Sequence, residues 1–221
     1  MKKINIFNLI MLVLIILADI SFMRTGSLLD KSIASLMFVA VGLVNLIYLL
    51  KVKRVKRIST YIMFVGLCFA CLGDVFLEIE FIIGAGLFAL GHVFYFISYC
   101  GMIKLRWKDL LFSLLIAIPS LLLILCAPIF DFGANIMKIV CCVYAIIISF
   151  MVGKAVSNLV EKRSVLNLIV LIGSVLFFFS DLMLLFNIFA DVGTMFGALC
   201  LLTYYPAEFL LAYSILKHNK E

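Results

Sequence analysis

Eight runs of about 20 apolar residues, separated by short polar segments, constrain the fold of this chain more than any other feature of its sequence. A helix needs about 20 apolar residues to cross a hydrocarbon core roughly 30 Å thick. Only 14% of the 221 residues are charged, against roughly 25% in soluble domains. A transmembrane β-barrel would instead show alternating segments of about 10 residues. The apolar runs are residues 4–23, 32–50, 59–79, 81–102, 109–128, 134–153, 165–187 and 193–216.

These runs predict an all-α polytopic membrane bundle of eight transmembrane helices. The polar stretches are too short for a soluble domain, so we expect a single transmembrane domain over residues 1–221. The first run follows Met1, Lys2 and Lys3 in the manner of a signal peptide, but no small-residue cleavage pattern comes after it. We therefore expect it to be retained as the first helix of a multi-pass protein of the cell membrane.

The basic residues are distributed unevenly between the two sides that eight helices would create. Of the 18 Lys and Arg residues, 15 fall in the terminal segments or in the loops after the second, fourth and sixth runs. The other side holds only Arg24, Lys31 and Lys138. Because cytoplasmic loops are enriched in Lys and Arg, this asymmetry predicts that both termini are cytoplasmic. The net charge of +6 then reflects topology and contact with anionic lipids, and does not indicate a nucleic-acid partner.

A short internal similarity links the third and seventh runs. The third contains Gly66-x7-Asp74 and the seventh contains Gly173-x7-Asp181, each with a small residue directly before the Asp. Runs that are four apart cross the membrane in the same direction. The similarity therefore favours a parallel repeat of four plus four helices.

Six ionisable side chains fall within the apolar runs. Such groups are costly in hydrocarbon, so they mark functional sites by default. At 1.5 Å per residue, Asp74 and Asp181 lie roughly 8–9 Å from the outer ends of their helices, and His92 lies about 16 Å deep. These depths predict that the three side chains meet in one cavity in the outer half of the membrane. The six residues are Asp19, Asp74, Glu78, His92, Asp181 and Glu208.

We predict Asp74, Asp181 and His92 as the catalytic groups, because a purely structural role explains them least well. Pro206 removes a backbone hydrogen bond from the eighth helix, and the resulting kink could aim Tyr204 or Tyr205 inward. Six further residues are predicted to line the site and bind substrate: Tyr204, Glu208, Lys31, Tyr95, Glu78 and Asp19.

Structural roles remain open for three of these lining residues. Glu78 lies near the interface, where water can solvate it, and Asp19 could serve only as a hydrogen-bonding group. Lys31 opens the second helix, where it could act as an interface anchor.

Three motifs in this chain resemble those of the YhhN family of membrane proteins, in the family's order and spacing. They are Gly73-Asp74-Val75-Phe76-Leu77 with Phe81-x2-Gly84 and Phe88-x3-His92-x2-Tyr95, then Gly173-x3-Phe177-x2-Ser180-Asp181-x2-Leu184, and finally Thr203-Tyr204-Tyr205-Pro206-Ala207-Glu208. Two positions depart from the family pattern. Lys31 is followed by Ser32 where the family has Lys-Pro, and Glu208 stands where the family has Gln.

The resemblance implies lysoplasmalogenase activity, which is hydrolysis of the vinyl ether bond of a lysoplasmalogen. The products would be a fatty aldehyde and glycerophosphocholine or glycerophosphoethanolamine. The expected partners are this lysophospholipid substrate and membrane lipids, and no cofactor is expected. Glu208 in place of the amide would alter substrate choice or pH dependence.

Vinyl ether hydrolysis requires an acid that protonates the double bond and a base that activates water on the resulting oxocarbenium ion. Glycoside hydrolases divide similar work between two carboxyl groups. Asp74 and Asp181 suit this division, although the sequence does not assign which of them is the acid. His92 would orient groups or share protons, and Lys31 could meet the lipid phosphate.

Other functions use the same residues. Asp74, His92 and Asp181 could hold a divalent metal ion that activates water, although the sequence lacks a dense ligand motif such as HExxH, and we predict no metal. A proton-coupled transporter or a lipid-binding membrane protein would also place acidic residues near mid-membrane in a repeated bundle. A purely structural protein would leave the paired Asp motifs unexplained.

Overall fold

The computed structural model describes residues 2–54 and 56–218. Within these residues it contains eight α-helices and a short 3-10 helix. All eight α-helices are long and apolar enough to cross a membrane. The prediction of an all-α, eight-helix, multi-pass membrane protein is therefore confirmed. The helices are α1 (Lys2–Thr25), α2 (Leu28–Lys51), α3 (Ile58–Leu77), α4 (Phe81–Met102), α5 (Trp107–Cys126), α6 (Asn135–Glu161), α7 (Val165–Phe189) and α8 (Met195–Ser214), which continues into the 3-10 turn η1 (Ile215–Lys217).

Helices α2 and α6 depart most from their predicted bounds. Helix α6 was expected to end at residue 153 but continues to Glu161. The extra turns are stabilised where the Lys154 ammonium pairs with the Asp109 carboxylate on α5 at 2.8 Å, with both side chains buried. Helix α2 begins at Leu28, so Lys31 lies within its first turn and not at its first residue.

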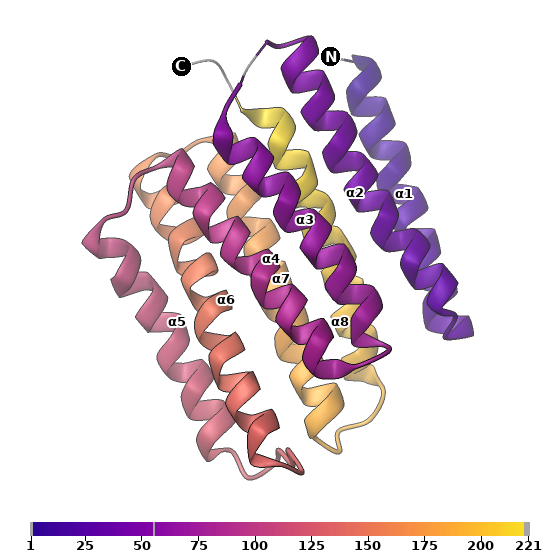
Figure 1. Cartoon of the computed structure of the whole chain (residues 1–221), viewed down its shortest axis with the longest axis vertical. Coiled ribbons are helices and arrows are strands. Elements are labelled where there is room, and N and C mark those ends of the chain that lie inside the picture. The colour runs from indigo at the N-terminus through magenta and orange to yellow at the C-terminus, as the bar shows by residue number, and fades with distance from the viewer. Residues whose placement is uncertain (1, 55, 219–221) are drawn as a thin grey trace.

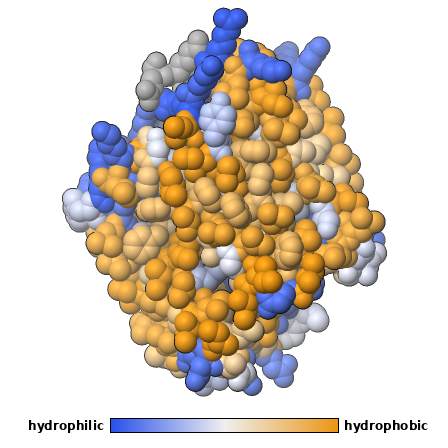
Figure 2. Space-filling view, viewed as in Figure 1, coloured by the Kyte–Doolittle hydropathy of each residue, from blue (hydrophilic) through white to orange (hydrophobic). Residues whose placement is uncertain are grey.

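The pairs α1–α2, α3–α4, α5–α6 and α7–α8 each pack as an antiparallel hairpin. The α1–α2 and α5–α6 hairpins form opposite flanks, and α3, α4, α7 and α8 lie between them (Figure 1). Helix α1 begins, and α8 ends, at the same end of the bundle. Hydrophilic residues gather at that end, whereas the middle of the molecule is largely hydrophobic (Figure 2). Lys220, one of the counted basic residues, lies outside the described residues. The cytoplasmic orientation and the four-plus-four repeat stay predictions.

Polar side chains inside the bundle find partners on neighbouring helices. Asn8 on α1 and Asn45 on α2 exchange two amide hydrogen bonds of 3.0 Å each. Asn45 also donates to the carbonyl of Ala212 on α8 at 3.3 Å. Such bonds help helices associate in lipid, where the hydrophobic effect between helices is weak. They connect the first hairpin to the helix that carries the third motif.

Glycines allow α3 and α4 to pack closely. A Cβ atom on Gly73 would lie 2.8 Å from the ring of Phe88, and one on Gly84 would lie 2.5 Å from the backbone of Leu77. Small residues at helix interfaces permit this approach of backbones in membranes. The close packing brings the motif residues of α3 against those of α4.

Candidate active site

A polar cavity of about 350 Å³ opens in the half of the bundle where α3 and α7 end and α4 and α8 begin. Its wall includes Lys31 from α2, Asp74 and Glu78 from α3, Asp181 from α7 and Tyr204 from α8. Two sequence-predicted catalytic carboxylates therefore reach one cavity from helices that are four apart in the chain. We call this hollow the polar cavity.

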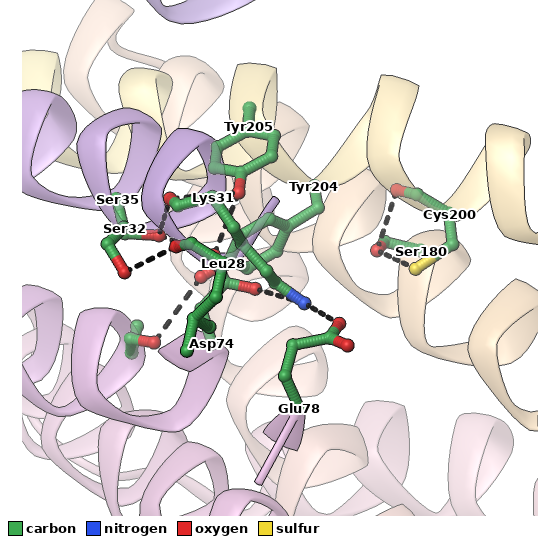
Figure 3. Close-up of polar contacts among 11 residues, drawn as sticks. Leu28, Lys31, Ser32, Ser35, Asp74, Glu78, Ser180, Cys200, Tyr204 and Tyr205 are labelled. Carbon is green, nitrogen blue, oxygen red and sulfur yellow. Dashed lines mark hydrogen bonds and ion pairs between the residues drawn. The ribbon is translucent and has the colours of Figure 1, made fainter. Parts of the chain in front are cut away.

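On one wall of the polar cavity, Lys31 pairs with two carboxylates. Its ammonium lies 3.2 Å from Oδ1 of Asp74 and 2.6 Å from Oε1 of Glu78 (Figure 3). It also lies 5.1 Å from the centre of the Phe22 ring. Lys31 is only 3% exposed, so it is not simply an interface anchor. Glu78 is partly exposed, in line with its expected place near the interface, yet it is also paired.

The second oxygen of Asp74 is held by two hydroxyl groups. Tyr205 donates to Oδ2 at 2.9 Å, and the Ser35 hydroxyl also donates to this oxygen (Figure 3). With the Lys31 ammonium on the other oxygen, three donors surround the carboxyl group of Asp74. Hydrogen bonds of this kind hold the carboxyl group in one orientation.

Asp181 belongs to a second cluster. The Tyr144 hydroxyl, from α6, donates to Oδ2 of Asp181 at 2.6 Å. His92 on α4 places Nε2 at 2.8 Å from the same hydroxyl and 3.3 Å from Oδ2 of Asp181. His92 is fully buried, whereas the Asp181 side chain keeps 12% of its surface exposed. Asp181 therefore faces the cavity, and His92 contacts it from behind.

Tyr204 lies between the two carboxylate clusters. Its ring packs edge-on against those of Phe88 and Phe177, with centroids 5.7 and 5.3 Å apart. The neighbouring residue Tyr205 donates a hydrogen bond to Asp74, and both tyrosines are buried in the bundle. Before Asp181, the Ser180 hydroxyl donates to the carbonyl of Cys200 at 3.0 Å and ties α7 to α8 (Figure 3).

Three predicted binding residues lie outside the wall of the polar cavity. Tyr95 donates to Oε2 of Glu208 at 2.7 Å, and both side chains are fully buried. Asp19 is 2% exposed, and its Oδ1 has no hydrogen-bond partner among the described residues. None of these three side chains is among the described residues that line the cavity. Their part in substrate binding stays a prediction.

Comparison with protein-family models gives a match that covers nearly all residues of this site. The family model for YhhN matches residues 31–215. The chain belongs to the YhhN family. The match begins at Lys31, so it includes every predicted site residue except Asp19 and omits the whole of α1. The YhhN family includes lysoplasmalogenases. No curated protein and no solved structure matches the chain.

Three residues of the site escaped the sequence analysis as contributors. Ser35 lies four residues after Lys31 and so shares its helical face, which was an available signal. Tyr205 stands beside Tyr204 in the last YhhN motif, but the sequence left open which of them points inward. Tyr144 is surrounded by apolar residues in α6, and nothing in the sequence connects it with Asp181.

Asp74, His92 and Asp181, the three residues considered as metal ligands, lie in two different clusters. Asp74 is bound by Lys31, Ser35 and Tyr205, whereas His92 and Asp181 contact each other in another cluster. Among the described residues, no group of three or more His, Cys, Asp or Glu side chains is arranged to hold a metal ion. The site is organised around paired carboxyl groups.

Proposed function

We propose that this YhhN protein is a lysoplasmalogenase-like hydrolase, which cleaves the vinyl ether bond of a lysoplasmalogen to a fatty aldehyde and a glycerophospho head group. One observation carries the proposal: Asp74 and Asp181 line the same cavity from α3 and α7. Membership of a family that includes lysoplasmalogenases supports the reaction type. The eight membrane-crossing helices suit a substrate that resides in lipid.

The reaction needs one proton donor and one site that handles a cation and water. A proton added to the double-bond carbon remote from oxygen leaves an oxocarbenium ion. Water adds to the carbon next to oxygen and loses a proton, giving a hemiacetal. The hemiacetal then breaks its bond to the glycerol oxygen, which takes up a proton, and the aldehyde is released. Water is the only co-reactant consumed.

The surroundings of the two carboxyl groups suggest different roles. Asp74, held in one orientation by three donors, is suited to stabilise the cation and to hold the attacking water. Asp181 contacts only the neutral Tyr144 hydroxyl and the His92 ring among the partners described for it, so we propose it as the acid. His92 would return a proton to Asp181 after each turnover.

The charges of the cavity favour a zwitterionic head group. Asp74, Glu78 and Asp181 supply three acidic groups, and Lys31 supplies one ammonium. A choline or ethanolamine group would meet the carboxylates, and the lipid phosphate would approach Lys31.

The test is release of fatty aldehyde from a choline lysoplasmalogen by the purified protein. We expect Asp74→Asn and Asp181→Asn each to lower turnover by about 100-fold or more. Asp191→Asn, at an exposed position of the α7–α8 loop, is the matched control and should keep wild-type turnover. If both cavity variants stay near wild type, the mechanism is wrong. If wild-type protein releases no aldehyde but transports the lipid in proteoliposomes, the carrier alternative is correct.

A further inference from the structure

A second hollow, of about 90 Å³, lies between α4, α5, α6 and α7. Its wall is built mainly from apolar side chains, including Ala85 of α4, Ile124 of α5, and Cys141 and Ala145 of α6. Asp181 is the one charged residue among the described residues that line it. We call this hollow the apolar groove.

The apolar groove continues from the polar cavity. Leu77, Phe88, Asp181, Leu184 and Ile188 line both hollows. Asp181, the proposed acid, therefore lies at the boundary, with Lys31 and Glu78 on one side and apolar walls on the other. A polar and an apolar compartment joined at one carboxyl group match the two parts of an amphiphile with one hydrocarbon chain.

The extramembrane end of the groove is covered by aromatic residues. Phe132, in the α5–α6 loop, packs on Phe189 with ring centroids 4.9 Å apart, and Phe81 packs on the same ring at 5.5 Å. The backbone N–H of Asp131 donates to the carbonyl of Phe189 at 2.8 Å, which fastens the loop over α7. These aromatic rings therefore cover the groove at this end.

On one side, the groove lies between two helices that do not pack closely on each other. Helix α5 packs on α6 and makes no extensive contact with α4 within the described part of the chain. Both α4 and α5 nevertheless line the groove, which runs along α7 from Phe178 to Phe189, or about 16 Å at 1.5 Å per residue. A hydrocarbon chain could thus extend from the groove into the bilayer between α4 and α5 without crossing a polar surface.

We infer that the apolar groove binds the hydrocarbon chain of a single-chain lipid, whose head group occupies the polar cavity and whose chain passes Asp181. That the chain passes a catalytic residue rests on the proposed hydrolase function. Each methylene buried there adds apolar contact, so the groove makes affinity depend on chain length. A second acyl chain would have no compartment of its own in the described hollows, so we expect lysolipids to bind in preference to diacyl lipids.

The first test compares long and short substrates. Ala145→Phe fills the groove, so kcat/KM for an octadecenyl lysoplasmalogen should fall by about tenfold or more, with a much smaller change for an octenyl chain. Val143→Phe adds the same ring on the lipid-facing side of α6, where Val143 is 51% exposed, and should leave both values near wild type. Ala85→Phe narrows the opposite wall and serves if the first variant fails to fold. Equal losses for long and short chains would overturn the inference.

The second test does not depend on hydrolysis. A non-cleavable alkyl ether lysophospholipid carrying a terminal diazirine is photolysed with the full-length protein in detergent. Crosslinks should map to the groove segments of α5 and α6, and should be lost in Ala145→Phe but kept in Val143→Phe. Crosslinks spread over the lipid-facing surface would contradict the groove. Groove-specific crosslinks in a protein that releases no aldehyde would uphold the chain site and refute the hydrolase proposal instead.

Discussion

At the scale of single residues, the hydroxyl of Tyr144 connects His92 and Asp181, which are 89 positions apart in the chain. A tyrosine hydroxyl has one proton to donate, and the 2.6 Å contact directs it to Asp181. The Tyr144 oxygen can then accept a hydrogen bond from Nε2–H of His92. His92 Nδ1 has no hydrogen-bond partner among the described residues. This order of donors holds Asp181 in position and fixes the ring of His92.

Removing that hydroxyl should impair proton transfer without removing a catalytic group. We expect Tyr144→Phe to lower aldehyde release by about tenfold or more, because Asp181 and His92 lose their shared partner. The pH profile of turnover should also change shape. Tyr61→Phe, at a lipid-exposed position of α3, is the control. Unchanged turnover and an unchanged pH profile in Tyr144→Phe would show that the bridge has no part in the reaction.

Variants of two buried lysines should distinguish an effect on stability from an effect on activity. Lys31 pairs with Asp74 in the polar cavity, and Lys154 pairs with Asp109 at the other end of the bundle. Replacing either by Met leaves a buried carboxylate uncompensated, which costs about 3–5 kcal/mol. We expect both variants to melt at a lower temperature, measured by thermal unfolding in detergent. Turnover per folded molecule should fall only in Lys31→Met, and an equal fall in Lys154→Met would contradict the assignment.

At the scale of helices, the α3–α4 hairpin positions the first family motif. Gly84, in the first turn of α4, lies directly against the backbone of Leu77, the last residue of α3. This contact sets the distance between the two helices beside Asp74 and Glu78. Gly86 lies only two residues further, but a Cβ atom there would meet nothing within 4 Å.

The two glycines allow a matched comparison. Gly84→Ala should destabilise the protein by about 1–3 kcal/mol, because a methyl group 2.5 Å from backbone atoms forces the helices apart. Gly86→Ala should leave stability unchanged or raise it slightly, since Ala favours helix. Thermal unfolding of the two purified variants measures the difference. Equal melting temperatures would mean that α3 and α4 can separate without cost.

The end of α8 packs against the α2–α3 connection through His218. Burial, together with the nearby cations Arg57 and Lys53, lowers the pKa of His218 from 6.5 to about 4. The unfolded chain therefore binds a proton at this residue at a higher pH than the folded chain does. The contribution to stability is full above about pH 6.5 and is lost as the pH falls toward 4.

Acid should consequently loosen this end of the bundle. At pH 4 the loss attributable to His218 is about 3 kcal/mol, visible as a lower melting temperature between pH 7 and pH 4. His218→Gln cannot titrate, so its melting temperature should depend less on pH than that of the wild type. Parallel curves for the two proteins would refute this role of His218.

At the scale of the whole molecule, the charge asymmetry predicts how the bundle lies in the membrane. A fluorescent protein fused to the C-terminus should fold and fluoresce, because we expect that end in the cytoplasm. Alkaline phosphatase inserted in the α5–α6 loop, near Gly133, should be active on the opposite side. The reverse pattern would invert the bundle and place the polar cavity in its cytoplasmic half.

The sequence by itself determined the fold class and the helix count. Apolar length and the exclusion of polar groups from hydrocarbon leave few solutions for eight such runs, and α4 has the predicted bounds 81–102. Sequence also marked Asp74 and Asp181, because unpaired carboxyl groups are costly in lipid. These inferences depend on local composition and on the properties of the bilayer.

Only the tertiary structure decided which side chains meet. The depth of a residue along a helix does not fix the direction in which its side chain points around the helix axis. The sequence therefore could not show that Asp74 pairs with Lys31 in one cluster while Asp181 contacts His92 in another. Nor could it place Tyr95 and Glu208 outside the cavity wall or bring Tyr144 to Asp181. Helix α6 continues beyond its apolar run because Lys154 pairs with Asp109 on α5. From the sequence alone, a lysine at this position would be expected in water at the end of the helix. Such contacts depend on packing between helices distant in the chain, and packing is a property of the assembled bundle.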